Sequence, residues 1–383
     1  MVVLGLARSG QAASSALARR GVDVVGVDRT LGNDEGLAVL DGAGLLVKSP
    51  GVPGEHPLVI EARSRGIPVW SEVELGFRLL RDARVVGVTG TNGKTTTVEL
   101  LGAIFRAAGR DVAVAGNVGR PLSGIEPAEW VVCELSSFQL EDVHELACDV
   151  AVLLNIEPDH LDRHGTLEAY RETKLRIFER ARAKVVPRGS GLEGVEFSAD
   201  DPLPAEPRIP GRHNRENAAA ATAAARAAGI GDRAIGSALS TFPGVRHRLE
   251  LVTEVGGVRY INDSKATNVT AARRALEVYE SEQVYLIAGG RGKGEPFAQL
   301  ADVLGANVRA VYAIGETAGE IAAAVGDRAI VADDLASAVR LVSDTARSGD
   351  VVLLSPACAS YDQYNDFEER GEEFRRLVQN LTS

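Results

Sequence analysis

A lysine set among glycines and threonines is the first group whose residue types and spacing could do chemistry. The stretch VVGVTGTNGKTTTVELLG, residues 85–102, runs from an apolar segment through Gly, Thr and Asn to apolar residues near helical spacing. Gly90 and Gly93 let backbone N–H groups converge on an anion, and the dipole of the following helix adds to the attraction. Lys94 would contact β- and γ-phosphates, and the Thr95 hydroxyl would bind Mg²⁺. These residues predict a phosphate site with ATP as its ligand.

The match to the general phosphate-loop pattern is imperfect. Counting back from Gly93, the first glycine of that pattern falls at Val88, and Gly87 is one residue too early. A Gly-Lys-Thr sequence can also open a helix after a plain turn. The apolar strand before the loop and the helix after it favour phosphate binding over that alternative.

Acidic residues and histidines follow the next two apolar runs. The run WVVCE ends in Glu134, and an acid just past a buried strand beside a phosphate loop can hold Mg²⁺. The alternative for Glu134 is an acid that stabilises a helix N-terminus, and we favour the metal role. After VAVLLN, His160 lies among Asp159, Asp162 and His164. The residues alone leave a metal site and a solvated loop equally open there.

Three strand-to-loop junctions of one kind occur in the last third of the chain. The segments VRYINDSKATN, VYLIAGGRGKG and VVLLSPACASYDQYNDF each begin as an apolar strand and end in small, polar or charged residues. Ligands of open parallel sheets collect at the carboxyl ends of the strands, so we expect the three loops to share one edge. The side chains that they would contribute to a binding site are Asp263, Lys265, Thr267, Lys293 and Ser360.

The N-terminal segment VVLGLARSGQAASSALARRGVDVVGVD predicts strand, helix and strand. It contains Gly5-x-Ala7-x-x-Gly10, and Asp28 lies near the distance expected for a ribose-binding acid. Ala7 replaces the glycine that lets the backbone approach a pyrophosphate, which argues against an ordinary NAD site while leaving room for another nucleotide. The loop VKSPGVPGEHP follows another short strand and should lie at the same sheet edge.

Length and composition limit the class of protein. The 383 residues, 45% of them hydrophobic and 25% charged, predict two or three soluble domains. Alternating strands and helices predict an α/β fold of parallel sheets with crossover helices. A net charge of −11 argues against nucleic acid as the main partner. No apolar run is long enough to span a bilayer, and the N-terminus lacks the features of a signal peptide.

The cysteines indicate the compartment. Cys133, Cys148 and Cys358 show neither CxxC spacing nor a disulfide pattern, so we expect buried thiols in a reducing cytoplasm. We also expect the protein to act as a monomer on small-molecule substrates, without nucleic acid or membrane partners.

Six motifs in order carry a resemblance that covers nearly the whole chain. They are TGTNGKTTT, ELSSFQLE, NIEPDHLDRHG, KLRIF, GRHNRENAAAA and INDSKATN. In type and order they resemble the Mur ligase family, and INDSKATN with LLSPACASYDQY is similar to the member that adds D-glutamate. The TGTNGKT form of the loop accounts for the one-residue offset from the general pattern. The resemblance is looser over the first unit, and residues 183–211 are shorter than the family's pattern.

The resemblance implies three domains. A Rossmann-like domain at residues 1–72 would hold the UDP part of the substrate, and a central P-loop ATPase-like domain with a parallel sheet would occupy residues 73–244. A Rossmann-like C-terminal domain at residues 245–383 would receive the amino acid.

The implied activity is ATP-dependent amide formation between D-glutamate and UDP-N-acetylmuramoyl-L-alanine, through an acyl phosphate. This reaction belongs to cytoplasmic peptidoglycan precursor synthesis, and therefore to cell-wall growth, cell shape and division. The implied cofactors are ATP and two Mg²⁺ ions, with Lys174 carbamylated into a carboxylate-like ligand. Without the resemblance, Lys174 is expected to face solvent, because a protonated lysine repels a metal ion.

The resemblance also assigns roles to individual positions. The catalytic residues would be Lys94, Glu134, His160 and Lys174. The metal ligands would be Thr95, Glu134, His160 and Lys174. ATP would be bound by Gly90, Thr91, Asn92, Gly93, Lys94, Thr95, Thr96, Asn214, Asn217, Arg248 and Asp263. The UDP substrate would be bound by Ser9, Ser49, Asn117 and His160. D-Glutamate would be bound by Thr267, Lys293, Ser360 and Phe367.

Three alternatives stay open at this point. A nicotinamide-dependent enzyme could be built on the first strand–helix–strand unit, although Ala7 argues against it. A non-catalytic ATP-binding regulator would keep the phosphate loop but lose Glu134, His160 or Lys174, all of which are present. A member of the same family that adds a different amino acid is the nearest competitor.

Overall fold

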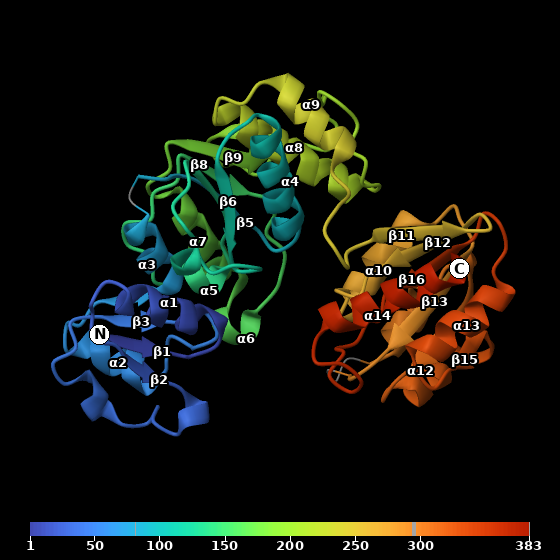
Figure 1. Ribbon diagram of the computed structural model, residues 1–383, viewed down its shortest axis with the longest axis horizontal. Coiled ribbons are helices and arrows are strands. Elements are labelled where there is room, and N and C mark those ends of the chain that lie inside the picture. The colour runs from blue at the N-terminus through green and yellow to red at the C-terminus, as the bar shows by residue number, and fades with distance from the viewer. Residues whose placement is uncertain (81, 293–295, 383) are drawn as a thin grey trace. The chain divides into compact units, whose positions relative to one another are not determined.

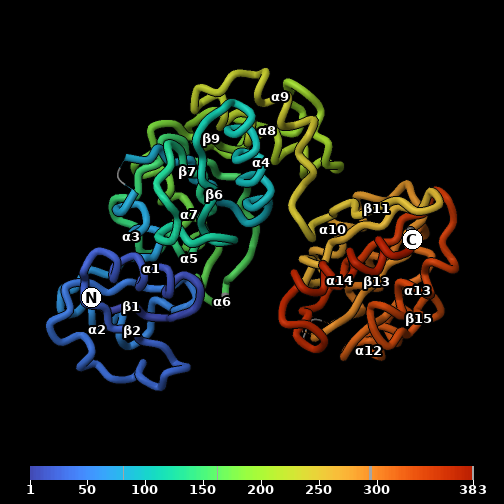
Figure 2. Tube along the Cα trace, viewed as in Figure 1, coloured from blue at the N-terminus to red at the C-terminus, as the bar shows by residue number. Residues whose placement is uncertain are grey.

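The computed structural model describes residues 1–80, 82–292 and 296–382 (Figure 1). The chain forms two compact units, Met1–Phe242 and Pro243–Ser383. Its strands form three sheets, which follow one another along the sequence (Figure 2). Two sheets lie in the first unit and one in the second.

The first sheet has the strand order β2-β1-β3-β4, and all its pairs are parallel. Its strands are β1 (Val2–Leu4), β2 (Val25–Val27), β3 (Leu46–Lys48) and β4 (Val69–Ser71). Its helices are α1 (Arg8–Ala18), α2 (Pro57–Ser64) and α3 (Glu72–Leu79). Because strand side chains alternate between faces, Val3 packs with α1 and α3, whereas Val2 and Leu4 pack with α2.

The second sheet has the order β10-β9-β8-β5-β7-β6, again with parallel pairs. Its strands are β5 (Arg84–Thr89), β6 (Val112–Gly116), β7 (Trp130–Glu134), β8 (Val150–Leu153), β9 (Ala183–Pro187) and β10 (Val195–Phe197). Its helices are α4 (Lys94–Ala107), α5 (Ser137–Leu140), α6 (Leu161–His164), α7 (Leu167–Leu175), α8 (Arg212–Ala227) and α9 (Asp232–Thr241). Since β5 lies between β7 and β8, the segments that follow these three strands meet at one edge.

The third sheet has the order β11-β12-β16-β13-β14-β15. Its strands are β11 (Glu250–Val255), β12 (Val258–Asn262), β13 (Val284–Gly289), β14 (Val308–Ile314), β15 (Ala329–Val331) and β16 (Val351–Leu354). Its helices are α10 (Val269–Val278), α11 (Ala298–Asp302), α12 (Ala318–Val325), α13 (Leu335–Thr345) and α14 (Phe367–Gln379). One core packs α10, α11 and α12 on one face of the sheet, and a second core packs α13 and α14 on the other.

The predicted α/β fold of three sheets is confirmed, with one departure from parallel pairing. Strand β11 pairs antiparallel with β12 because only Gly256 and Gly257 separate them, and both have positive φ, of 58° and 78°. A two-residue turn of this kind joins antiparallel neighbours. The predicted domain boundary at residues 72 and 73 stays a prediction, since the first two sheets share one compact unit. The boundary between the units, at Phe242 and Pro243, lies close to the one predicted at residues 244 and 245.

Two further observations concern the core and the surface. Cys133, Cys148 and Cys358 are buried, as predicted. In the ranges that the structure describes, no helix combines the length and the apolar character needed to cross a membrane.

Candidate active site

The phosphate loop connects the end of β5 to the start of α4. Gly93 is the residue before the helix, and its φ of 84° is left-handed. A Cβ atom there would lie 2.2 Å from Asn217 Oδ1, so both conformation and space require glycine. The loop therefore turns tightly into a helix N-terminus, the place where backbone N–H groups of a helix can bind an anion.

Two lysines meet at one carbonyl group of this loop. Lys94 Nζ donates to Gly90 O at 2.8 Å and to Thr91 O at 2.9 Å. Lys174 Nζ, on α7, donates to the same Gly90 O at 2.8 Å. The structure thus brings together two residues that the sequence separates by eighty positions: Lys94, predicted to contact the β- and γ-phosphates, and Lys174, predicted to bind the second Mg²⁺.

Lys174 is buried, with 1% of its surface exposed, so the expectation made without the resemblance, that it faces solvent, was wrong. Helix α7 directs it inward together with Tyr170, one turn earlier, and its ammonium lies 4.6 Å from the Tyr170 ring centre. Burial, together with the positive charge of Lys94, lowers the pKa of Lys174 to about 7. A substantial fraction of this amine is therefore neutral at neutral pH, which is the form that reacts with an electrophile.

Glu134 ends β7 next to the phosphate loop and is only 2% exposed. Its Oε1 accepts a hydrogen bond from Asn117 Nδ2 at 3.1 Å. Its Oε2 is buried and has no hydrogen-bond partner among the residues that the structure describes. Burying an unpaired carboxylate oxygen is costly, and a cation would offset that cost. Together with the buried Thr95 in the first turn of α4, these oxygens fit a Mg²⁺ ion.

His160 lies where the chain leaves β8 and enters α6, in a left-handed conformation with φ of 52°. Its half-exposed ring stands 3.5 Å from Asp159 Oδ2 and 4.8 Å from the centre of the Phe138 ring. His164 turns inward instead, with Nε2 3.0 Å from Ser137 Oγ. Among the described side chains, which do not include that of Asp162, no three acidic, histidine or cysteine residues form a metal-binding group. The roles of His160 and Lys174 as metal ligands stay predictions.

The other predicted ATP residues of the first unit lie in the loop itself, in α4 and in α8. Thr91 Oγ1 lies 3.2 Å from the Tyr170 hydroxyl, and Asn92 Nδ2 donates to Glu157 Oε2 at 2.9 Å. Thr96 is buried in the first turn of α4. Asn214 and Asn217 lie in the first two turns of α8. Asn214 Nδ2 donates to Pro210 O at 2.7 Å, and the Asn217 side chain lies against Gly93.

The predicted UDP residues Ser9 and Ser49 lie at the edge of the first sheet. Ser49 Oγ donates to Gly5 O at 2.7 Å, and Ser9 is the second residue of α1. The carboxylate of Asp28 accepts hydrogen bonds from Leu6 N at 2.5 Å and Thr30 N at 2.8 Å, which lower its pKa. The Asp28 carboxylate is thus used to hold the turn after β1 in place. This argues against its binding a ribose, as it would in a nicotinamide-dependent enzyme.

The three loops of the second unit share one sheet edge, as predicted, because β12, β16 and β13 are parallel neighbours. Ser360 is buried after β16, and Thr267 lies half-buried after β12. Phe367 begins α14, and Lys265 Nζ lies 5.6 Å from its ring centre. Lys293 lies outside the described residues, so its predicted contact with D-glutamate stays a prediction.

Arg370 organises these loops and was missed by sequence reasoning. It is 1% exposed and donates to Ser264 O at 2.9 Å, to Cys358 O at 3.1 Å and to Ala359 O at 3.3 Å. It thus ties the loop after β12 to the loop after β16. Burial lowers its pKa to about 10. In the sequence, its burial is indicated only by its position four residues before Phe374, which places it on the apolar face of α14.

Asp263, a predicted ATP residue, is buried directly after β12. Its carboxylate accepts hydrogen bonds from Ser355 Oγ at 2.8 Å and Leu249 N at 3.2 Å, but burial outweighs them and raises its pKa to about 7. Arg248, which precedes Leu249, acts in the opposite direction and lowers this pKa.

This raised pKa predicts a pH-dependent stability. Between about pH 4 and pH 7 the folded protein holds a proton on Asp263 that the unfolded chain releases, so stability falls as pH rises through that window. Asp263→Asn should remove this component. Thermal unfolding at several pH values should show the melting temperature of the wild type declining relative to that of Asp263→Asn as pH rises. Parallel curves for the two proteins would contradict the assignment.

The fold and the site together define the class: an α/β phosphate-loop protein in which a buried carboxylate, Glu134, and a buried lysine, Lys174, lie beside the loop. Comparison with known proteins narrows this class. Residues 88–188 match the Mur ligase middle domain, and residues 247–358 match the Mur ligase, glutamate ligase domain. These two matches cover most of the second and third sheets. The chain belongs to the Mur ligase family.

Relatives match over the full length. The chain is 41% identical to the UDP-N-acetylmuramoylalanine--D-glutamate ligase of Anaeromyxobacter dehalogenans, over 99% of this chain and 97% of that protein. It is 40% identical to the protein of the same name from Pelotomaculum thermopropionicum, over 100% and 97% of the two chains. The crystal structure of the UDP-N-acetylmuramate-alanine ligase MurC from Thermotoga maritima is similar in fold, with a TM-score of 0.65 at 20% identity over 99% of both chains.

Proposed function

We propose that this chain joins D-glutamate to the L-alanyl carboxylate of UDP-N-acetylmuramoyl-L-alanine, converting ATP to ADP and phosphate, in peptidoglycan precursor synthesis. The observation that carries the proposal is the full-length identity of about 40% to relatives named for this reaction. The phosphate loop, the buried Glu134 and the buried Lys174 supply the chemistry that such a reaction needs.

The chemical problem is the leaving group. A carboxylate is a poor acyl electrophile, because attack by an amine would have to expel oxide or hydroxide. Transfer of the γ-phosphoryl group from ATP to the carboxylate gives an acyl phosphate and ADP. The neutral amine of D-glutamate then attacks the acyl carbon, the C–O bond to phosphate breaks, and the amine proton is lost as the amide forms. Catalysis of both steps consists mainly of alignment and charge stabilisation.

The residues of the phosphate loop would do this work. Lys94 would move from the carbonyls of Gly90 and Thr91 to the phosphates, and the N-terminus of α4 would bind them through backbone N–H groups. Thr95 and Glu134 would hold one Mg²⁺, which neutralises phosphate charge when bound. Asn117, which donates to Glu134, would orient that carboxylate and face the UDP substrate.

Lys174 and His160 would form the second metal site. We propose that the neutral Lys174 amine adds to CO₂: an N–C bond forms, one proton is released, and the neutral amine becomes an anionic carbamate. The buried position and lowered pKa of Lys174 support this step, because an exposed lysine stays protonated. We place the reaction in the cytoplasm and propose that the enzyme acts as a monomer.

The choice of amino acid tests the proposed function. Thr267, Ser360 and Phe367, with Lys293, would bind the two carboxylates and the carbon chain of D-glutamate. With ATP and UDP-N-acetylmuramoyl-L-alanine present, phosphate release should be faster with D-glutamate than with L-glutamate, L-lysine, meso-diaminopimelate or L-alanine. Lys293→Ala should raise the KM for D-glutamate far more than the KM for ATP. Faster release with another amino acid would assign the chain to a different reaction of the family, and no release with any would indicate a non-catalytic ATP-binding protein.

A further inference from the structure

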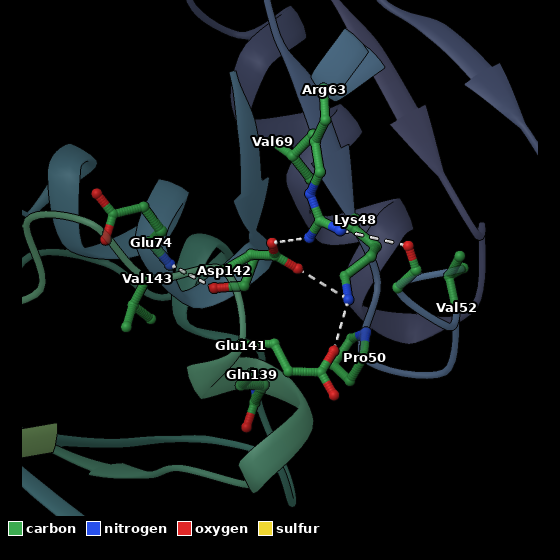
Figure 3. A network of polar contacts seen from close by, with 12 residues as sticks. Lys48, Pro50, Val52, Arg63, Val69, Glu74, Gln139, Glu141, Asp142 and Val143 are labelled. Atoms are coloured by element: carbon green, nitrogen blue, oxygen red, sulfur yellow. Dashed lines mark hydrogen bonds and ion pairs between the residues drawn. The ribbon is translucent and has the colours of Figure 1, made fainter. Parts of the chain in front are cut away.

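Five charged side chains meet between the first and second sheets of the first unit, away from the phosphate loop. They come from β3, α2, the end of α5 and α6, and they are Lys48, Arg63, Glu141, Asp142 and Arg163. Figure 3 shows Lys48 between the carboxylates of Glu141 and Asp142, with Arg63 on the far side of Asp142. The cluster joins segments of the two sheets that lie far apart in sequence.

Lys48 is fully buried at the centre of this cluster. Its Nζ donates to Glu141 Oε2 at 2.9 Å, and it lies 2.8 Å from Asp142 Oδ2 in an ion pair without hydrogen-bond geometry. Asp142 Oδ1 accepts from Arg63 Nη2 at 2.7 Å. Removing such charges from water is costly, so a buried ion pair adds little to the stability of the fold. We therefore explain this pair by the relative positions of the two segments that it fixes.

Arg163 connects this cluster to the loop that follows Ser49. Its Nε and Nη2 donate to the two oxygens of Glu141 at 2.9 and 2.7 Å, which is the bidentate geometry that suits a guanidinium. Its Nη1 donates to Pro50 O and its Nη2 to Val52 O, each at 3.0 Å. Four hydrogen bonds from one side chain therefore fix the loop after β3 against the end of α5.

Arg163 also belongs to the helix that begins after His160, the histidine predicted to bind a metal ion. Arg163 lies in α6, three residues after His160. Its guanidinium stacks 4.2 Å from the centre of the Phe138 ring, and that ring also contacts His160 at 4.8 Å. Burial raises the pKa of Glu141, but the hydrogen bonds from Arg163 and Lys48 outweigh it and lower that pKa overall, which keeps the carboxylate ionised.

We propose that Arg163 is a positioning residue: through Glu141 and the carbonyls of Pro50 and Val52, it holds the loop after β3 and helix α6 in one arrangement. The UDP end of the substrate, expected at Ser49, and His160, expected at its reacting end, are thereby kept at a fixed separation. This inference rests on the proposed function for its substrate, although the contacts themselves do not depend on it.

The kinetic test compares Arg163→Met, Arg163→Lys and a control. Losing charge-assisted hydrogen bonds to two carbonyls and a carboxylate should raise the KM for UDP-N-acetylmuramoyl-L-alanine about tenfold or more in Arg163→Met. kcat should fall as well, whereas the KM for ATP should stay within about twofold, since the contacts that the structure describes for Arg163 are with Glu141, Pro50, Val52 and Phe138 and not with the phosphate loop. Arg163→Lys, which keeps the charge but has a single donor nitrogen in place of the guanidinium's three, should recover part of the loss. Arg182→Met should behave as wild type, because the Arg182 side chain is 83% exposed and its described ion pair is with Asp149, outside the cluster.

A second measurement does not require ligation. Amide hydrogen exchange should become faster in both segments 50–56 and 161–165 of Arg163→Met and Glu141→Gln, and in neither segment of Arg182→Met. A lower melting temperature with unchanged KM values and no joint change in exchange would overturn the positioning role, even if the wild type ligates D-glutamate. If exchange becomes faster in both segments of these variants but the wild type ligates nothing, the contacts are supported and the proposed function is rejected instead. If Arg163→Met does not fold, the same comparison is made with Arg163→Lys.

Discussion

Lys94→Ala and Glu134→Gln each lower the rate of ligation by about 10²–10³-fold or more, while the protein stays folded. Lys94 is the cation of the phosphate loop, and we expect it to exchange its hydrogen bonds to the carbonyls of Gly90 and Thr91 for contacts with phosphate oxygens. Glu134→Gln keeps the size of the side chain and an oxygen for Asn117, but it removes the charge. Its buried Oε2, which lacks a hydrogen-bond partner in the part of the chain that the structure describes, is the atom that we expect to bind Mg²⁺. Steady-state phosphate release measures the effect.

A matched control for this loss is Glu129→Gln. Glu129 is a partly exposed carboxylate of the same unit, paired with Arg84 at 2.6 Å, and its replacement should leave turnover unchanged. Circular dichroism and thermal unfolding should be similar for all three variants. Near-normal turnover in a correctly folded Lys94→Ala protein would contradict the assignment of the phosphate loop.

Lys174→Ala abolishes ligation, and short carboxylic acids such as formate or acetate restore part of it. The substitution removes the carbamate and leaves a small buried space beside Gly90 and Tyr170, where a free carboxylate can take the same position. Adding acid to the wild type should have no such effect. Activity of Lys174→Ala measured against carboxylate concentration, with Lys184→Ala as the control for a partly exposed lysine of the same unit, tests this rescue.

The chemical state of Lys174 can also be observed directly. With ¹³C-labelled CO₂, the wild type should show a carbamate carbon signal that is missing from Lys174→Ala. An active enzyme without that signal, or an electron-density map with a bare lysine amine, would reject carbamylation even if Lys174→Ala is inactive.

Local patterns made the phosphate loop and its edge predictable. Gly93 is required by a left-handed turn into a helix, and Glu134 by its place at the end of a buried strand, so both could be inferred from neighbouring residues. The shared edge of the three C-terminal loops followed from the rule that parallel strands end together. The antiparallel strand β11 also had a local signal, in the Gly256–Gly257 turn, that the expectation of parallel sheets passed over.

Charged residues inside the fold could not be predicted in the same way. Without the family resemblance, Lys174 was expected to face solvent because a protonated lysine repels a metal ion. Its burial depends on tertiary contacts with Gly90 and Tyr170, which no local pattern shows. Lys48 and its partner Glu141 are 93 positions apart, so no local pattern pairs them. Arg370 likewise acts on carbonyls of loops that precede it, at Ser264 by more than a hundred positions.

The most direct test of the account follows an oxygen isotope through the reaction. UDP-N-acetylmuramoyl-L-alanine labelled with ¹⁸O in both oxygens of the alanyl carboxylate is incubated with enzyme, ATP, Mg²⁺ and D-glutamate. If the carboxylate is phosphorylated and then attacked by the amine, one ¹⁸O must appear in inorganic phosphate and one must remain in the new amide. The account predicts this result, together with a UDP product heavier by one glutamyl residue. Unlabelled phosphate from a reaction that nevertheless forms the product, or no product with D-glutamate, would contradict it.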